Sequence, residues 1–171
     1  MKTQKKSTVF LVQAALIAAV YAAVTYFIAP LSFGAQQMRI SEALTVLPVL
    51  TPAAIPGLAV GCIIANISSP YGLVDIVCGT AATILAAILT RAARNIRFKN
   101  LPLLSLVFPV LFNGIVIGAE ITFFMPDGAS FKSFIIAAGS VALGEALSCY
   151  AVGLPLFTAL RKTKIFDEVT K

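Results

Sequence analysis

Two glutamates lie deep inside apolar stretches of the chain, where an ionisable side chain requires a specific reason. Glu120 lies in the apolar run 101–125, and Glu145 lies in the run 133–160. A carboxylate within a membrane span is energetically costly and marks a candidate functional site. Because a carboxylate accepts hydrogen bonds from N–H groups and attracts cations, Glu120 and Glu145 are the first candidates for binding a small polar solute.

Further polar and aromatic residues complete a predicted substrate-binding shell around these two acids. Asn113 lies seven residues before Glu120, nearly two helical turns, so both side chains share one face. The other candidates are Phe112, within the run 101–125, and six residues near the ends of apolar runs: Glu42, Arg39, Gln37, Asn66, Asp75 and Tyr71.

Each of these residues also has a purely structural explanation. Glu42 and Asp75 fall in the first turns of predicted helices, where the helix dipole favours a carboxylate. Asn66 can close a helix end. Glu120 and Glu145 can be neutral and hydrogen-bonded, or paired with Arg39 as a structural lock. Arg39 can therefore contact either the ligand or an acid of the protein.

The sequence lacks the motifs of several common enzyme and metal-binding classes. The chain has no histidine, which rules out a Ser-His dyad and the HExxH zinc motif. It has no GxxxxGK[ST] motif for ATP hydrolysis. Cys62, Cys78 and Cys149 lie in apolar stretches without CxxC spacing, so we expect no metal site. We predict a protein that is not an enzyme and has no cofactor of its own.

The composition predicts an integral membrane protein. Of the 171 residues, 59% are hydrophobic and only 12% are charged, and the mean hydropathy is +0.96. A soluble domain of this size cannot bury so much apolar surface. The net charge of +6 comes from basic residues at the ends of apolar runs, which is typical of cytoplasmic anchoring rather than of nucleic-acid binding.

The distribution of the basic residues predicts the topology. They cluster before residue 7, between residues 91 and 99, and after residue 160. If all three clusters are cytoplasmic, the proline-rich stretch 41–66 must cross the membrane twice or not at all. We predict an all-α membrane protein, a single domain over residues 1–171, with both termini cytoplasmic. Its six transmembrane helices, of which the second and third are short, are expected at 9–29, 41–50, 52–66, 73–92, 101–125 and 133–160.

Within this topology the second helix begins with Ser41 as its cap, and Pro52 lies in the first turn of the third. Ten residues of α-helix rise only about 15 Å, so the second helix needs burial among longer neighbours. The predicted pocket opens outward and is acidic, because Glu42, Asp75, Glu120, Asp127 and Glu145 outnumber Arg39 and Lys132 in the outer half and near the midplane.

The first predicted helix presents two parallel rows of small residues at a spacing of four. Such rows let another helix approach closely, either within the chain or from a separate partner. The residues are Ala14, Ala18 and Ala22 in one row, and Ala15, Ala19 and Ala23 in the other. Gly114 and Gly118 give a similar signal, which we expect to serve packing within the chain.

The stretch from Gln37 to Pro48, QMRISEALTVLP, resembles the family of QueT proteins. Members of this family are substrate-binding subunits (S components) of energy-coupling factor transporters and are associated with queuosine precursors. The resemblance implies capture of a 7-deazaguanine, such as the aminomethyl or cyano form, beneath a lid at about residues 31–40. Aromatic residues such as Phe112, Phe123, Tyr71 and Phe33 would sandwich the flat base.

The resemblance further implies the partners and the location of the protein. The alanine rows would dock on a transmembrane coupling subunit that carries two ATPase subunits, which use the ATP, in the plasma membrane of a bacterial cell. Two alternatives remain open: a stand-alone secondary carrier or channel for a small cationic or neutral solute, and a structural membrane protein that binds no solute.

Overall fold

The structure, a computed structural model, describes residues 2–28, 39–126, 129–163 and 165–166, and within these ranges the fold is all-α. Residues Phe98 and Leu101 form an isolated β-bridge, and the described residues contain no longer strand. The helical elements are α1 (Lys2–Phe27), η1 (Ile40–Val49), α3 (Ala54–Asn66), α4 (Leu73–Ala92), η2 (Ala93–Asn95), α5 (Val107–Phe123), α6 (Phe131–Ala146), η3 (Leu147–Gly153) and α7 (Leu154–Thr163).

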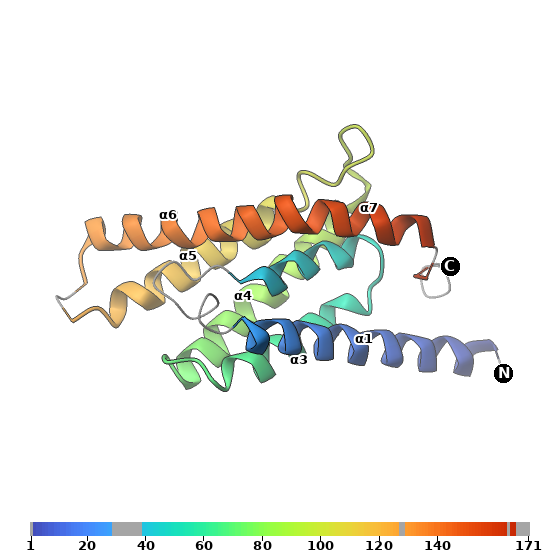
Figure 1. The fold of residues 1–171 in the computed structure, drawn as a ribbon, viewed down its shortest axis with the longest axis horizontal. Coiled ribbons are helices and arrows are strands. Elements are labelled where there is room, and N and C mark those ends of the chain that lie inside the picture. Colours follow the sequence, from blue (N-terminus) through green and yellow to red (C-terminus); the bar gives the residue numbers. More distant parts are fainter. Residues whose placement is uncertain (1, 29–38, 127–128, 164, 167–171) are drawn as a thin grey trace.

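The helices form an elongated bundle whose long axis they roughly follow (Figure 1). The start of α1 and the end of α7 lie at one end, here called the termini end, and the loop before α5 projects from the same half of the molecule. The turns between α3 and α4 and between α5 and α6 lie at the opposite end, here called the far end. The helical runs Lys6–Phe27, Leu73–Asn95 and Phe131–Thr163 are long and apolar enough to cross a membrane.

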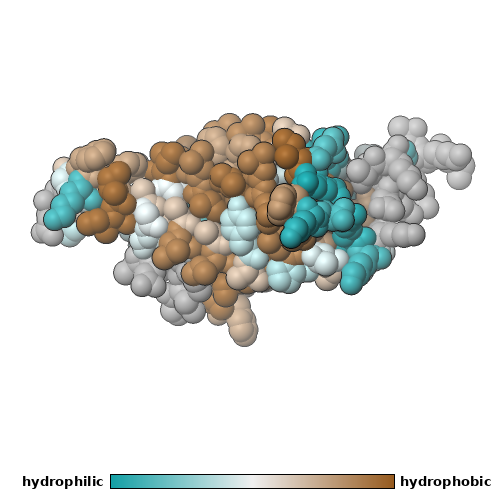
Figure 2. All heavy atoms as spheres, turned by 90° about the horizontal axis from the view of Figure 1, so that it is seen from above, coloured by the Kyte–Doolittle hydropathy of each residue, from teal (hydrophilic) through white to brown (hydrophobic). Residues whose placement is uncertain are grey.

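Apolar side chains also cover much of the surface between the two ends. A broad hydrophobic region occupies the middle of the molecule, and hydrophilic residues gather toward the termini end (Figure 2). Leu11, Val77 and Leu143 are each more than 60% exposed. An apolar surface of this extent is stable only against lipid or a protein partner, as predicted for an integral membrane protein.

The second helix differs from the prediction in its geometry. Over Ile40–Val49 the backbone is a 3₁₀ helix, not an α-helix. A 3₁₀ helix rises about 2 Å per residue, so ten residues reach roughly 20 Å rather than 15 Å. Ser41 is not its cap, because Arg39 takes that position and the Ser41 hydroxyl receives a hydrogen bond from Thr25 at 2.7 Å. The element is largely buried, as predicted for a segment too short to cross alone.

The third helix begins two residues later than predicted, at Ala54. Pro52 therefore precedes the helix and does not lie in its first turn. The turn between η1 and α3 is held by Thr51, whose hydroxyl accepts a hydrogen bond from the Ala53 backbone N–H at 3.3 Å. The position of the turn, at Thr51 and Pro52, agrees with the prediction.

Helices α1 and α3 pack closely because α3 carries glycines at the contact. A Cβ added to Gly57 would lie 2.8 Å from the Ala14 carbonyl oxygen, and one added to Gly61 would lie 3.0 Å from that of Ala18. The row of Ala14, Ala18 and Ala22 therefore faces the interior of the bundle, whereas Ala15, Ala19 and Ala23 are exposed.

The fifth helix is shorter than predicted and begins at Val107 instead of residue 101. The chain turns tightly at Lys99 and Asn100, which have positive φ values of 47° and 66°. The segment before the helix is then held by two hydroxyl groups, from Tyr150 to the Leu103 carbonyl (2.9 Å) and from Thr90 to the Ser105 carbonyl (2.9 Å). These side-chain bonds satisfy the segment's backbone carbonyls outside a regular helix.

The last helical run is continuous over Phe131–Thr163 but contains a π-helical segment, Leu147–Gly153, that the prediction of one uniform helix missed. Pro155 has no backbone N–H, so the α-helical hydrogen-bond pattern is interrupted just before it. Gly153 also lies against η1, where an added Cβ would be 3.0 Å from the Ala43 carbonyl oxygen. The π segment directly follows Ala146 and thus adjoins Glu145.

Helices α5 and α6 approach each other through Gly114 and Gly118, as predicted. A Cβ on Gly118 would lie 2.5 Å from the Cα of Ala138. The apolar core lies between α1, η1, α3, α4, the start of α5 and the last helical run, and it includes Val46, Leu47, Val49, Ala54, Leu58, Ala87, Leu106 and Phe157.

Candidate functional site

Eight buried polar side chains from six elements or their boundaries come together in the interior of the bundle. Each is at most 5% exposed. We call this set the polar cluster; it consists of Tyr21, Arg39, Glu42, Asn66, Asp75, Asn113, Glu120 and Glu145.

Arg39 and Asp75 form a buried ion pair. The Arg39 Nη2 atom lies 3.0 Å from Oδ2 of Asp75. Asn66 donates from Nδ2 to the other Asp75 oxygen at 3.3 Å and to the Asp75 backbone carbonyl at 3.0 Å. Of the two roles open to Arg39, the structure therefore places it in an ion pair, and its acid is Asp75 rather than Glu120 or Glu145.

Glu42 is anchored on one side only. The Tyr21 hydroxyl donates a hydrogen bond to Oε1 of Glu42, whereas Oε2 has no partner among the described residues. The Glu42 backbone carbonyl accepts from the Thr45 hydroxyl at 2.6 Å and from the Cys149 thiol at 3.6 Å. These contacts hold the backbone of η1 at Glu42 against the π segment and leave one carboxylate oxygen for another donor.

Glu145 lies close to Glu42, and Asn113 lies beside both. The two carboxyl groups are near enough to interact electrostatically, and the Asn113 side chain interacts with each of them. Oε2 of Glu145 is buried without a partner among the described residues. An amide between two carboxyl groups can donate through its N–H groups and accept through its oxygen.

Glu120 is 5% exposed, and neither of its carboxyl oxygens has a hydrogen-bond partner in the described part of the chain. The groups with which it interacts electrostatically are Asp75 and Arg39. Since Arg39 is already bonded to Asp75, Glu120 remains an acid without a dedicated cation of its own.

The cluster thus holds four carboxyl groups against one guanidinium group. A buried acceptor without a donor costs about 1–3 kcal/mol, and more if it is charged. This arrangement favours a ligand that brings N–H donors or positive charge. In the part of the chain that the structure describes, no group of three or more His, Cys, Asp or Glu side chains is placed to hold a metal ion.

The aromatic residues predicted to pack on the substrate differ in how far they are buried. Phe112 and Tyr71 are half-buried, and the Tyr71 ring packs on Phe124 with their centroids 5.4 Å apart. Phe123 is 78% exposed. Gln37, Phe33, Asp127 and most of the proposed lid at residues 31–40 lie outside the described residues.

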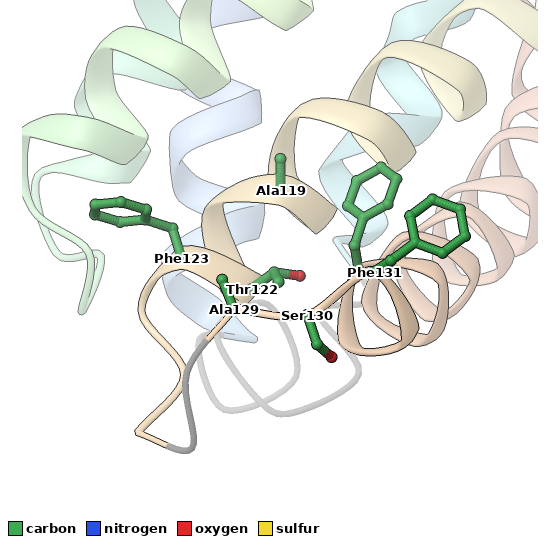
Figure 3. A pocket seen from close by; sticks show the side chains of 7 residues that line it. Ala119, Thr122, Phe123, Ala129, Ser130 and Phe131 are labelled. Carbon is green, nitrogen blue, oxygen red and sulfur yellow. The ribbon is translucent and has the colours of Figure 1, made fainter.

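A surface groove of about 430 Å³ lies between the end of α5 and the start of α6, and it is distinct from the polar cluster. Its lining includes Ala119, Phe123 and Phe131, with Thr122 and Ser130 as the polar members (Figure 3). None of its lining residues is charged. The groove therefore offers no charge to a polar solute, unlike the cluster.

The sequence analysis missed Tyr21, which the structure places against Glu42. A buried tyrosine hydroxyl usually finds a hydrogen-bond partner, so a tyrosine in the middle of an apolar helix is a usable signal. The hydroxyls of Thr80, Ser105 and Ser148 are also buried and unpartnered among the described residues, and the sequence analysis did not single them out. Their positions in the sequence give no comparable signal, because a serine or threonine in a span often bonds its own helix.

Comparison with known proteins gives one clear result. No curated protein and no solved structure matches the chain. The family described as the QueT transporter matches residues 11–162, which is most of the sequence. This match confirms the resemblance inferred from the stretch between Gln37 and Pro48. The chain therefore belongs to the QueT transporter family and is a membrane transport protein.

Proposed function

We propose that this chain is the substrate-capturing subunit of an ATP-driven importer of the energy-coupling factor type, and that its substrate is a 7-deazaguanine precursor of queuosine. The observation that carries the proposal is the polar cluster, in which Glu42, Glu120 and Glu145 retain buried carboxyl oxygens without partners among the described residues. A transport protein of this family has to bind a solute within the membrane, and these oxygens specify a donor-rich one.

The chemistry of a guanine-like base suits this cluster. Its edge offers adjacent N–H donors that one carboxylate accepts as a pair, and its carbonyl oxygen can accept from the Asn113 amide. Charge-assisted hydrogen bonds contribute about 1.5–3 kcal/mol each, so two or three supply around half of the ~12 kcal/mol of nanomolar binding. Packing of the flat ring against half-buried side chains such as Phe112 and Tyr71 would supply the remainder.

The basic residues support an orientation with the termini end in the cytoplasm. Arg97, Lys99, Arg161 and Lys162 are exposed at or beside the loops of that end. Positively charged loops remain on the cytoplasmic side of a membrane. In this orientation six membrane crossings connect two cytoplasmic termini, and the far end faces the medium from which the solute is captured.

The exposed face of α1 supports docking on a coupling subunit. The predicted docking face is split by the fold, because Ala14, Ala18 and Ala22 pack within the chain. Ala15, Ala19 and Ala23 remain available and are flanked by Leu16, which is 63% exposed. A flat apolar face of small residues permits close approach of a partner helix inside a membrane.

The proposal is tested by binding and by uptake. The purified chain should bind a 7-deazaguanine in a calorimetric titration, and uptake into vesicles should require both the coupling subunit and ATP. Ala19→Leu should abolish uptake and leave binding unchanged, with Gly139→Leu as the control on another exposed helix face. Uptake by the chain alone, driven by an ion gradient, would instead establish a stand-alone carrier.

A further inference from the structure

The chain between η2 and α5 projects away from the long axis of the bundle as a tight turn, residues 96–101, here called the basic turn (Figure 1). Phe98 and Leu101 exchange two backbone hydrogen bonds, each 2.9 Å long. Between them Lys99 and Asn100 both have positive φ values, as in a type I′ turn. The Asn100 carbonyl accepts a hydrogen bond from the Arg161 guanidinium at 3.3 Å. The basic turn is therefore a defined structure that is held against α7.

The basic turn lies at the end of a membrane span. It follows directly on the helical run Leu73–Asn95, which is long and apolar enough to cross a membrane. Seen from the side to which the turn projects, the hydrophobic middle of the molecule borders directly on hydrophilic residues toward the termini end (Figure 2). Both observations place the basic turn at the level where the hydrocarbon of a bilayer meets its headgroups.

The basic turn exposes large apolar side chains at this level. Phe98 is 64% exposed and Ile96 is 57% exposed. Aromatic and apolar side chains beside basic ones are typical of segments that lie in the interface of a membrane. Exposed side chains of this kind favour a partner that offers apolar contact and not charge alone.

Positive charge surrounds these apolar side chains. Arg97 and Lys99 are exposed, and the Lys99 Nζ atom lies 5.7 Å from the centre of the Phe98 ring. The end of α7 adds the exposed residues Arg161 and Lys162. The four carboxyl groups that the structure describes all lie in the polar cluster, so none of them neutralises this surface. The basic turn is thus complementary to a partner that carries negative charge next to hydrocarbon.

We propose that the basic turn binds anionic phospholipids in the leaflet at the termini end, with Arg97 and Lys99 on the headgroups and Phe98 at the boundary of the acyl chains. A guanidinium group matches the oxygens of a phosphate, and basic segments next to a membrane span are attracted by anionic lipid. A zwitterionic lipid carries a compensating positive charge and so gains less from the same residues. The proposal requires only that the chain is embedded in a membrane, and it does not depend on which solute the chain binds.

The experiment uses fluorescence, because the chain contains no tryptophan. Phe98→Trp places a single reporter in the basic turn. The variant is reconstituted in bilayers of phosphatidylcholine and phosphatidylglycerol in which one lipid class at a time is brominated and quenches the tryptophan. We expect phosphatidylglycerol to be preferred about fivefold next to the reporter, the factor expected for one basic side chain at an anionic surface. Both leaflets have the same composition, so the orientation of insertion does not affect the result.

Two controls assign the preference to the charges of the basic turn. Added to Phe98→Trp, the pair Arg97→Gln and Lys99→Gln should reduce the preference to less than twofold, whereas Lys132→Gln, at an exposed position on α6, should leave it unchanged. Leu73→Trp reports from another exposed apolar position, which is 77% exposed at the start of α4 at the far end. Its fluorescence should be quenched equally by both lipid classes.

Three results would overturn the proposal. Equal quenching of Phe98→Trp by both lipid classes would mean that the basic turn contacts lipid without recognising charge. Absence of quenching by either class would mean that the turn lies away from the bilayer and leaves its apolar side chains to a protein partner. A fivefold preference that persists in the variant with both glutamines would assign the lipid contact to other residues. None of these results bears on solute binding, so the proposed function is tested separately.

Discussion

The polar cluster and the apolar core are neighbouring parts of one bundle that treat buried polar groups differently. The four buried acids of the described residues, Glu42, Asp75, Glu120 and Glu145, all belong to the cluster. Some polar side chains beside the core are paired with each other, as in the bond of 2.9 Å from the Thr51 hydroxyl to Oε1 of Gln13. The Gln13 amide donates in turn to the Ile165 carbonyl at 3.3 Å.

This difference separates stability from binding. Packing in a membrane protein comes from close contact and interhelical hydrogen bonds rather than from burial of apolar surface away from water. The apolar core has both close side-chain contacts and hydrogen bonds between its own helices. The cluster keeps carboxyl oxygens for a ligand and so gives up part of the stability that complete pairing would supply. Residues of the core should therefore matter for folding, and residues of the cluster for binding or for both.

The largest expected effect is the loss of the ion pair within the cluster. Asp75→Asn removes the carboxylate that lies 3.0 Å from Arg39 and should lower the free energy of unfolding by about 3–5 kcal/mol. Glu120→Gln is the matched control, because that carboxyl group has no hydrogen-bond partner to lose among the described residues. Denaturant unfolding in detergent measures both. If both variants lose the same free energy of unfolding, the acid paired with Arg39 and the unpaired acid contribute equally to stability, and the distinction between them is wrong.

A smaller effect is expected from a cavity in the apolar core. Phe157 is 1% exposed, and Phe157→Ala should cost about 3 kcal/mol through lost packing contacts. The folded fraction should bind 7-deazaguanine with unchanged affinity. Ultracentrifugation and calorimetry on the same sample provide the measurement. A large loss of affinity in the folded fraction would remove the distinction between core and cluster.

The contact between α5 and α6 supports the polar cluster, because α5 carries Asn113 and Glu120 while α6 carries Glu145. Gly118→Ala places a Cβ 2.5 Å from the Cα of Ala138 and should destabilise the protein by about 1–3 kcal/mol. Gly139→Ala, where nothing lies within 4 Å, should be neutral or stabilising by about 0.5–1 kcal/mol. Thermal unfolding compares the two, and a stable Gly118→Ala variant would contradict the close helix contact.

The smallest expected effects come from deleting one hydroxyl group in each region. Tyr21→Phe removes the donor to Glu42, and Thr51→Val removes the donor to Gln13. Each should cost about 1 kcal/mol of stability. Only Tyr21→Phe should also change ligand affinity, by roughly tenfold, because Glu42 then loses its anchor. A calorimetric titration of both variants decides this, and an effect of Thr51→Val on affinity would show that the regions are coupled.

Much of the fold could be predicted because it depends on composition and local chain signals. The span of α4 agrees with the prediction at both ends, since Gly72 and the basic residues after Leu89 mark its limits. The turn at Thr51 and Pro52 and the internal pairing through Gly114 and Gly118 were also predicted. The 3₁₀ geometry of η1, the late start of α5 and the π segment were missed. These features depend on contacts with distant parts of the chain, such as the bond from Tyr150 to the Leu103 carbonyl.

For the site, the sequence alone determined which residues are costly enough in a membrane to require a purpose. It identified Glu120, Glu145 and Asn113, because an ionisable or amide side chain in an apolar run is conspicuous. Tertiary structure decided which acids are paired and which are available, since hydrogen-bond partners such as Arg39 and Asp75 lie 36 residues apart in the chain. Partner choice depends on distances of a few ångströms between helices, and no local pattern of residues encodes those distances.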